Sequence, residues 1–410
     1  MIKKKLAALT AACALLLSGC SIPGETESVQ EDGSAGEVTH SGGAGYVDDT
    51  DSIRLPFAAE YYLGGSDENT VRACKRVYSA MRDCKPSADL SDCSITSETA
   101  DAIITLMVSA VPEFCSVDEA YSYVLDGDEN VIRLNLNYSA DKQKSDEMEA
   151  KLLETAQSIV DETAGMTDYE KTKLFHDRLV LGCSYDEHGL NCYTAYGCLV
   201  EGRAVCEGYS KAFMLLCELA DIDCLVVLGK TEGDVETLHM WNKIKLGDEW
   251  YNVDITWDDP ITNTDTEYVR YDYFNICDAA VLEDHTFTDK GLMRSPAANG
   301  CAFNYFAAEG LFVSERDQAE TVLEDAIVRA ADEGKPAAEI KLSDHELFRD
   351  VYSSFFEGDD PKAFEILGLA KQRTNASFNT DSYLVLKNDP QNTIVIIMDD
   401  YSQAETVNNE

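Results

Sequence analysis

The sequence predicts an α+β fold, in which a helix packs on antiparallel strands and further mixed segments flank this core. Two patterns carry this prediction. Apolar residues at helical spacing follow Cys206, and two stretches of alternating polarity, joined by Gly247-Asp248, come later in the chain. With 45% hydrophobic residues, the 410-residue chain can build a substantial core, and one to three domains are expected.

The predicted helix begins at Cys206 and continues through Ala212, Phe213 and Leu216, with Gly202 upstream where a turn would fall. At a helix N-terminus the macrodipole and the unpaired amide N–H groups stabilise a thiolate, which can lower a cysteine pKa from about 8.5 to about 3.5–7.5. The same N–H groups can receive an oxyanion. The position favours Cys206 as a nucleophile; the alternative is one more buried cysteine.

The two alternating stretches, 239–246 and 249–254, predict a β-hairpin that brings His239 and Asp254 near each other. A two-residue turn sets Asp254 opposite Trp241, with His239 diagonal to it on the same face; a turn shifted by one residue sets His239 directly opposite. This is the geometry of a base and its orienting carboxylate. Taken singly, each residue also fits a structural role, as a strand histidine or a turn-capping aspartate.

Several motifs around these residues resemble the transglutaminase-like superfamily, with a good match over about Thr167 to Pro260. They are Tyr169-Glu170-Lys171 through His176-Asp177, Tyr185-Asp186, Thr194 to Leu199, Val205-Cys206-Glu207-Gly208-Tyr209-Ser210, His239-Met240-Trp241-Asn242 and Trp250 through Pro260.

This resemblance implies a papain-like α+β fold, with the cysteine helix packed on an antiparallel sheet that carries the histidine and the aspartate. Matched motif to motif, it assigns Cys206 as nucleophile, His239 as base and Asp254 as orienter. Met240 stands where a small residue is expected, which changes packing but removes no catalytic group. Trp241 is a secondary candidate for the acyl or oxyanion region, although the role of a core aromatic on a strand fits at least as well. Tyr196 could donate to an oxyanion, and Tyr193 is equally available for this.

Members of the superfamily transfer an acyl group from glutamine to an amine or hydrolyse amide bonds through a thioester, and some are inactive. The resemblance therefore implies an amide-bond enzyme with a protein or peptide substrate, and hydrolysis is slightly favoured because water is abundant. The alternative is a catalytically silent surface protein that binds or scaffolds. A third hypothesis, a disulfide-built adhesin, is encouraged by the fourteen cysteines alone.

The composition narrows the range of partners. Asp and Glu number 76 against 33 Lys and Arg, a formal charge of −43, which disfavours nucleic acid as a partner. We expect no cofactor and no metal, because no CxxC pair occurs and the six histidines lack ligand spacing. Disulfide pairing stays open, although Cys217 and Cys224 have the apolar surroundings of core residues.

The first twenty residues predict export. A basic stretch, Lys3 to Lys5, precedes an apolar run too short to span a bilayer, Leu6 to Leu17. The run ends in Leu17-Ser18-Gly19-Cys20, which resembles a bacterial lipobox with Cys20 as the lipidated residue. We therefore expect a lipoprotein on the outer face of a bacterial membrane; an ordinary cleaved secretory signal is the alternative.

The predicted segments are a signal peptide at 1–19, a flexible Gly-Ser-rich acidic tether at 20–55, a mixed α/β region at 56–164, the catalytic domain at 165–290 and a small α/β region at 291–410. Outside the core, patterns predict helices at 100–111, 145–162, 318–331, 344–356 and 361–371, and strands at 120–125, 131–138, 338–342, 383–387 and 393–398.

Other polar residues are assigned structural roles. Asp258 and Asp259 are expected in a turn, and His176 and Asp177 in packing or a salt bridge on the leading helix. The acidic segment 232–238 is expected to be a loop.

Overall fold

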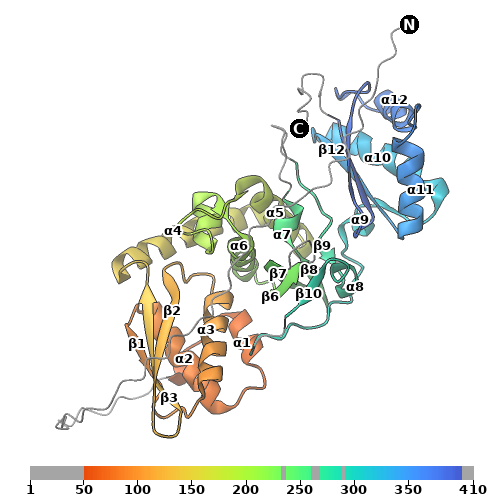
Figure 1. Cartoon of the computed structure of the whole chain (residues 1–410). Coiled ribbons are helices and arrows are strands. Elements are labelled where there is room, and N and C mark those ends of the chain that lie inside the picture. Colours follow the sequence, from red (N-terminus) through yellow and green to blue (C-terminus); the bar gives the residue numbers. More distant parts are fainter. Residues whose placement is uncertain (1–49, 232–236, 260–267, 289–290, 399–410) are drawn as a thin grey trace, which may run out of the picture. The chain divides into compact units, whose positions relative to one another are not determined.

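The computed structural model describes residues 50–231, 237–259, 268–288 and 291–398, which are drawn in colour in Figure 1. These residues belong to two compact units. The Cys206 unit comprises the described residues up to Lys245, together with Thr286–Ala297. The Asp254 unit comprises Leu246–His285 and the described residues from Ala298 onward. The domain borders predicted from the sequence at 164 and 290 stay a prediction.

The Cys206 unit opens with helices and a small antiparallel sheet in the order β1-β3-β2. The helix predicted at 100–111 and the hairpin predicted at 120–125 and 131–138 are confirmed. The elements are η1 (Thr50–Ser52), α1 (Phe57–Leu63), α2 (Glu68–Arg82), β1 (Ser87–Asp89), α3 (Ser97–Ala110), β2 (Val117–Leu125) and β3 (Val131–Tyr138).

Helical structure follows, from α4 (Lys142–Val160) and η2 (Asp161–Thr163) to α5 (Asp168–Gly182). Helix α4 begins three residues before the predicted start, because the Asp141 carboxylate caps it by accepting from the Lys144 N–H at 2.9 Å. A capping box between Thr167 and Glu170 begins α5. Two short parallel strands, β4 (Ser184–Tyr185) and β5 (Arg203–Ala204), flank a π-helical turn, η3 (Gly197–Glu201).

The centre of this unit is α6 (Cys206–Leu219), which packs against β6 (Cys224–Thr231). Strand β6 pairs antiparallel with β7 (Thr237–Leu246), with Gly229 opposite His239. The strand predicted from His239 is confirmed, and Cys217 and Cys224 are buried as expected. The loop predicted at 232–238 is wrong at its end, because β7 already includes residues 237 and 238; residues 232–236 lie outside the described residues.

The Asp254 unit starts with β8 (Glu249–Val253), whose predicted last residue, Asp254, instead caps the following helix α7 (Ile255–Asp258). Strand β8 pairs antiparallel with β9 (Phe274–Ile276). Next come α8 (Asp278–Val281), β10 (His285–Phe287), whose first residue belongs to this unit, and α9 (Tyr305–Ala308).

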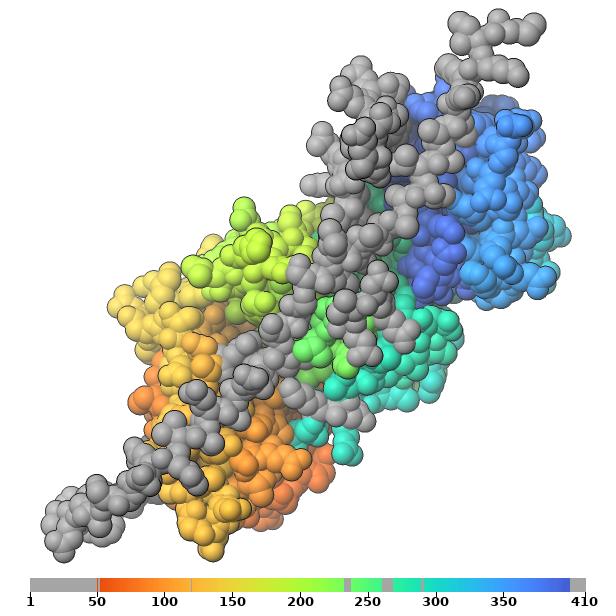
Figure 2. Space-filling model, viewed as in Figure 1, coloured from red at the N-terminus to blue at the C-terminus, as the bar shows by residue number. Residues whose placement is uncertain are grey.

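The C-terminal part of this unit is a four-stranded sheet in the order β11-β12-β14-β13, and α10 packs against β12 and α12. Figure 2 shows residues 319–398 as one closely packed body, coloured blue. All six elements predicted here are confirmed within two residues. The elements are β11 (Phe312–Val313), η4 (Arg316–Gln318), α10 (Ala319–Asp332), β12 (Ala337–Leu342), α11 (His345–Phe356), α12 (Ala363–Arg373), β13 (Leu384–Asn388) and β14 (Thr393–Ile397).

Among the described residues, none of the helices combines the length and the apolar character needed to cross a membrane. The predicted signal peptide, Cys20 and residues 20–49 of the predicted tether lie outside the described part of the chain.

Candidate active site

Cys206 is the first residue of α6, which confirms the helix N-terminus predicted from the sequence. The preceding Val205 has an extended backbone and supplies no side-chain cap. The first N–H groups of a helix have no partner within the helix, and together with the helix dipole they can stabilise negative charge. With 2% of its surface exposed, Cys206 is shielded from bulk water.

Gly208 allows a neighbouring loop to lie directly on the first turn of α6. A Cβ at this position would lie 2.5 Å from the Cys192 carbonyl oxygen and 3.0 Å from that of Thr194. The Cys192 carbonyl also accepts a hydrogen bond from the Val205 N–H at 3.0 Å. The loop therefore fixes the turn that carries Cys206, and only glycine permits this approach.

A buried ion pair strengthens the same turn. The Lys211 ammonium lies 2.5 Å from the Glu207 carboxylate and donates to the Tyr193 carbonyl at 3.2 Å. Tyr196 is half-buried and directly precedes the π-helical turn η3. The pair thus ties α6 to the segment that carries Tyr196, whose role at the oxyanion stays a prediction.

Two hydrogen bonds lock α6 onto strand β7, next to His239. The Ser210 hydroxyl, one helical turn beyond Cys206, donates to the Met240 carbonyl at 3.0 Å. The Asn242 side-chain amide donates to the Ser210 carbonyl at 3.0 Å. Helix α6 and strand β7 are therefore held together one residue from His239 and one helical turn from Cys206.

The His239 ring lies on the same strand face as Trp241, because residues two apart on a strand share a face. The two rings stack with centroids 6.0 Å apart and an interplanar angle of 21°, and Trp241 also packs against Phe287 at 5.4 Å. His239 is 4% exposed and Trp241 1% exposed. Trp241 thus supports the His239 ring from the core, while its predicted contact with substrate stays a prediction.

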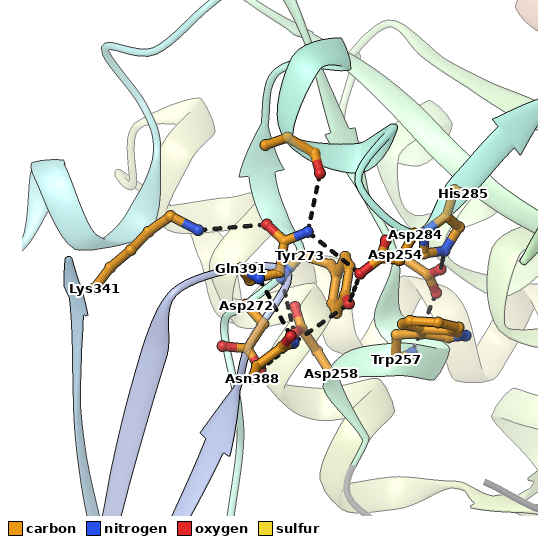
Figure 3. Close-up of polar contacts among 11 residues, drawn as sticks. Asp254, Trp257, Asp258, Asp272, Tyr273, Asp284, His285, Lys341, Asn388 and Gln391 are labelled. Atoms are coloured by element: carbon orange, nitrogen blue, oxygen red, sulfur yellow. Dashed lines mark hydrogen bonds and ion pairs between the residues drawn. The ribbon is translucent and has the colours of Figure 1, made fainter. Parts of the chain in front are cut away.

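Asp254 follows β8 and is held by hydrogen bonds to both carboxylate oxygens (Figure 3). Its Oδ1 accepts from the Trp257 N–H at 3.2 Å, which caps α7, and its Oδ2 lies 3.1 Å from His285 Nε2. Its own N–H donates to the Tyr273 carbonyl at 3.2 Å. Only 1% of the residue is exposed, so the carboxylate is fixed rather than solvated.

His285 is a residue that the sequence analysis did not single out. Its Nδ1 lies 2.5 Å from Asp284 Oδ1, so both ring nitrogens face carboxylates, and the residue is fully buried. Burial alone lowers the pKa of His285, but the hydrogen bonds and charges of Asp254 and Asp284 outweigh it and raise the pKa to about 9.

The remaining polar candidates make contacts that stabilise the fold. Asp258, predicted in a turn, is instead the last residue of α7, and its buried carboxylate accepts from the Tyr273 N–H at 3.0 Å. On α5, His176 Nδ1 lies 3.1 Å from the Asp177 carboxylate, which also pairs with Lys173 at 2.7 Å.

The structure thus places Cys206 and His239 in one compact unit and Asp254 in the other. The combination of all three as a triad stays a prediction.

Comparison with protein families gives a match to the transglutaminase-like superfamily over residues 154–255. This segment contains α5, α6, β6, β7 and β8, with all three predicted catalytic residues. Residues 154–255 are therefore a transglutaminase-like core, and the predicted fold class is confirmed.

The curated relatives cover a small part of each chain. Kyphoscoliosis peptidase from Homo sapiens is 33% identical over 93 residues, and that from Mus musculus is 30% identical over 93 residues. Each match covers 20% of this chain and 14% of the relative, so the chain spans about one-seventh of the length of these proteins.

Solved structures give weaker similarities. A protein from Cytophaga hutchinsonii assigned as a cysteine protease has a TM-score of 0.23 and 12% identity, with 33% of this chain and 61% of that chain covered. A TGase structure has a TM-score of 0.24 and 14% identity, with coverages of 37% and 46%.

Proposed function

We propose that this protein is a cysteine-dependent enzyme that acts on amide bonds through a thioester, with Cys206 as nucleophile, His239 as base and Asp254 as orienter. The observation that carries this proposal is the attachment of α6 to β7. Ser210, one turn beyond Cys206, is hydrogen-bonded to both neighbours of Trp241 on the His239 strand. A nucleophile on a helix N-terminus beside a strand histidine is the arrangement that cysteine catalysis requires.

The chain connection between β7 and β8 supports Asp254 as the orienter. Only Gly247 and Asp248 separate the two strands, and Gly247 has a φ of 62°, as a tight hairpin turn requires. A two-residue turn assigns Asp254 to the position opposite Trp241 and diagonal to His239. The orienting carboxylate would then share the strand face of the base.

The proposed reaction has two halves. The Cys206 thiolate attacks the amide carbonyl, a carbon–sulfur bond forms, and the tetrahedral oxyanion is stabilised by N–H groups of the α6 N-terminus. The carbon–nitrogen bond then breaks as protonated His239 gives its proton to the departing amine or ammonia. In the second half, His239 takes a proton from water or an acceptor amine, which attacks the thioester and releases Cys206.

Both acceptors fit a transglutaminase-like core, and we favour hydrolysis because water is abundant. Mass spectrometry of peptides that contain an internal glutamine, with and without a primary alkylamine, separates the outcomes. Peptide hydrolysis gives two fragments, glutamine hydrolysis converts the amide to an acid, and transfer gives the alkylamide. We expect one of these products from the wild type and none from Cys206→Ala. Equal product from both proteins would contradict the proposal.

We further propose that the enzyme works outside the cell as a lipoprotein anchored through Cys20, because a basic stretch, a short apolar run and Leu17-Ser18-Gly19-Cys20 follow in that order. The mass of the N-terminal peptide from protein isolated from bacterial membranes tests this. We expect a mature chain that starts at Cys20 with lipid attached. An unmodified cysteine, or a start at another residue, would contradict the anchor.

A further inference from the structure

His285 connects the predicted orienter to a second buried carboxylate. Asp254 Oδ1 accepts a hydrogen bond from the Trp257 N–H, and Asp254 Oδ2 lies 3.1 Å from His285 Nε2. On the other side of the ring, Nδ1 lies 2.5 Å from Asp284 Oδ1. The three residues form one continuous chain of hydrogen bonds, and each is at most 5% exposed.

Aromatic side chains prevent the His285 ring from rotating. Trp257 packs across the ring with centroids 4.4 Å apart, and Tyr273 lies at 5.5 Å. Trp257 and Tyr273 also meet edge to face at 5.2 Å. Figure 3 shows Trp257 beside the Asp254–His285 contact. The direction of the Nε2 atom toward Asp254 is therefore set by packing as well as by charge.

The far end of this chain of hydrogen bonds is anchored by the last residue of β13, Asn388, and by Gln391 in the turn that follows. The Tyr273 hydroxyl donates to Asp284 Oδ2 at 2.6 Å, and it accepts from the Asn388 side-chain amide at 3.3 Å. The Gln391 side-chain amide donates to the same Asp284 oxygen at 3.5 Å, and its Oε1 accepts a hydrogen bond from the Lys341 ammonium (Figure 3). The C-terminal sheet thus supports the residues behind Asp254.

We propose that His285 is a positioning residue, which fixes the direction of the Asp254 carboxylate from behind while Asp284 and the C-terminal sheet hold His285 in place. This inference rests on the proposed function, because it gives Asp254 the task of orienting His239. The charge balance is consistent with it. The imidazolium form, favoured by a pKa of about 9, carries a proton on each ring nitrogen and can donate to both carboxylates. The role also gives the C-terminal region a part in catalysis.

The test compares two substitutions of similar size in the full mature chain, with turnover measured on the peptide that the wild type processes. His285→Gln retains an amide donor for Asp254, whereas His285→Leu fills the space without one. We expect His285→Leu to lose kcat by about 10²-fold with little change in KM, as slight misplacement of a catalytic group does. His285→Gln should recover part of this loss. The exposed His345→Ala, in the same unit, is the control and should match the wild type.

A role in core packing alone would leave the two variants equal, and that result would overturn the inference. Histidine-selective nitrogen NMR of the folded Cys206→Ala protein gives an independent reading. We expect both His285 nitrogens to carry protons at pH 7, and a neutral ring there would also overturn it. If neither His285 variant folds, the NMR spectrum of the Cys206→Ala protein alone decides whether the inference stands. A wild type without peptide turnover would overturn the proposed function and this inference together, whereas wild-type turnover with no difference between variants overturns the inference alone.

Discussion

Replacing His239 with alanine is expected to lower kcat/KM for amide turnover by about 10²–10⁴-fold, the usual contribution of a positioned general base. The ring lies against Trp241, and its strand is fastened to the Cys206 helix through Ser210. In the proposed mechanism, alanine removes the group that takes the proton from Cys206 and later gives it to the departing amine, while the two hydrogen bonds of Ser210 remain. The loss should therefore appear mainly in kcat.

The matched control is His188→Ala, which removes an exposed histidine from the same unit. We expect it to keep wild-type kcat and KM, and thermal unfolding of both variants should show that each is folded. A folded His239→Ala protein with wild-type turnover would exclude His239 as the base. The enzyme would then need another proton acceptor for Cys206.

The second large effect is expected in stability when Asp254 is replaced. Asp254→Ala leaves the buried His285 without one of its two carboxylates and removes the cap of α7. Removing one partner of a buried ion pair costs about 3–5 kcal/mol. We therefore expect the free energy of unfolding, measured by urea titration at pH 6.5, to fall by about this amount.

The pH dependence of stability tests the same contact with a smaller change, Asp254→Asn. The pKa of His285 is raised from 6.5 to about 9 on folding. Its stabilising contribution is therefore fully present below pH 6.5 and is lost as pH rises toward 9. At about 1.4 kcal/mol per pKa unit, this loss is about 3 kcal/mol in the wild type. In Asp254→Asn we expect the decline of the unfolding free energy between these pH values to be clearly smaller.

The control is Asp248→Asn, in the exposed turn between β7 and β8 of the same unit. It should keep the wild-type decline between pH 6.5 and 9. Comparison between variants cancels the contribution of other groups that titrate in this range. Should Asp254→Asn and the wild type lose the same stability, the raised pKa of His285 would not depend on Asp254.

The sequence was most informative where local signals agree. The helix at Cys206, the strand from His239 and the six C-terminal elements show clear periodicity, and side-chain caps such as Asp344 fix where helices begin. Small errors arose at boundaries. Asp254 has the alternation of a strand residue, yet its carboxylate caps α7, so β8 ends one residue earlier.

Contacts over long sequence distances were not predictable. His285 opens a strand of three residues, too short for a period to show, and it meets Asp254 from 31 positions away. Asn388 and Gln391 lie more than 100 positions from the residues they support. Strand β6 was also missed, because its nearly continuous burial gives no alternation to detect. The adjacent Asp284-His285 pair was the only local signal for the network behind Asp254.

The most direct test of the central pair is the pH profile of Cys206 alkylation, read site by site by mass spectrometry in wild type, His239→Ala and Cys206→Ala. The exposed Cys301 is an internal reference for a thiol that is not activated. Partial burial and the neighbouring Cys277 raise its pKa. The pH midpoint of the alkylation rate reports thiolate formation. Limited access of the reagent to the buried Cys206 lowers the rate at every pH and does not move this midpoint. We predict a Cys206 midpoint well below the ~8.5 of a free thiol, shifted upward in His239→Ala. A Cys206 midpoint at or above that of Cys301 would contradict an activated nucleophile, and the protein would then be a silent binding module.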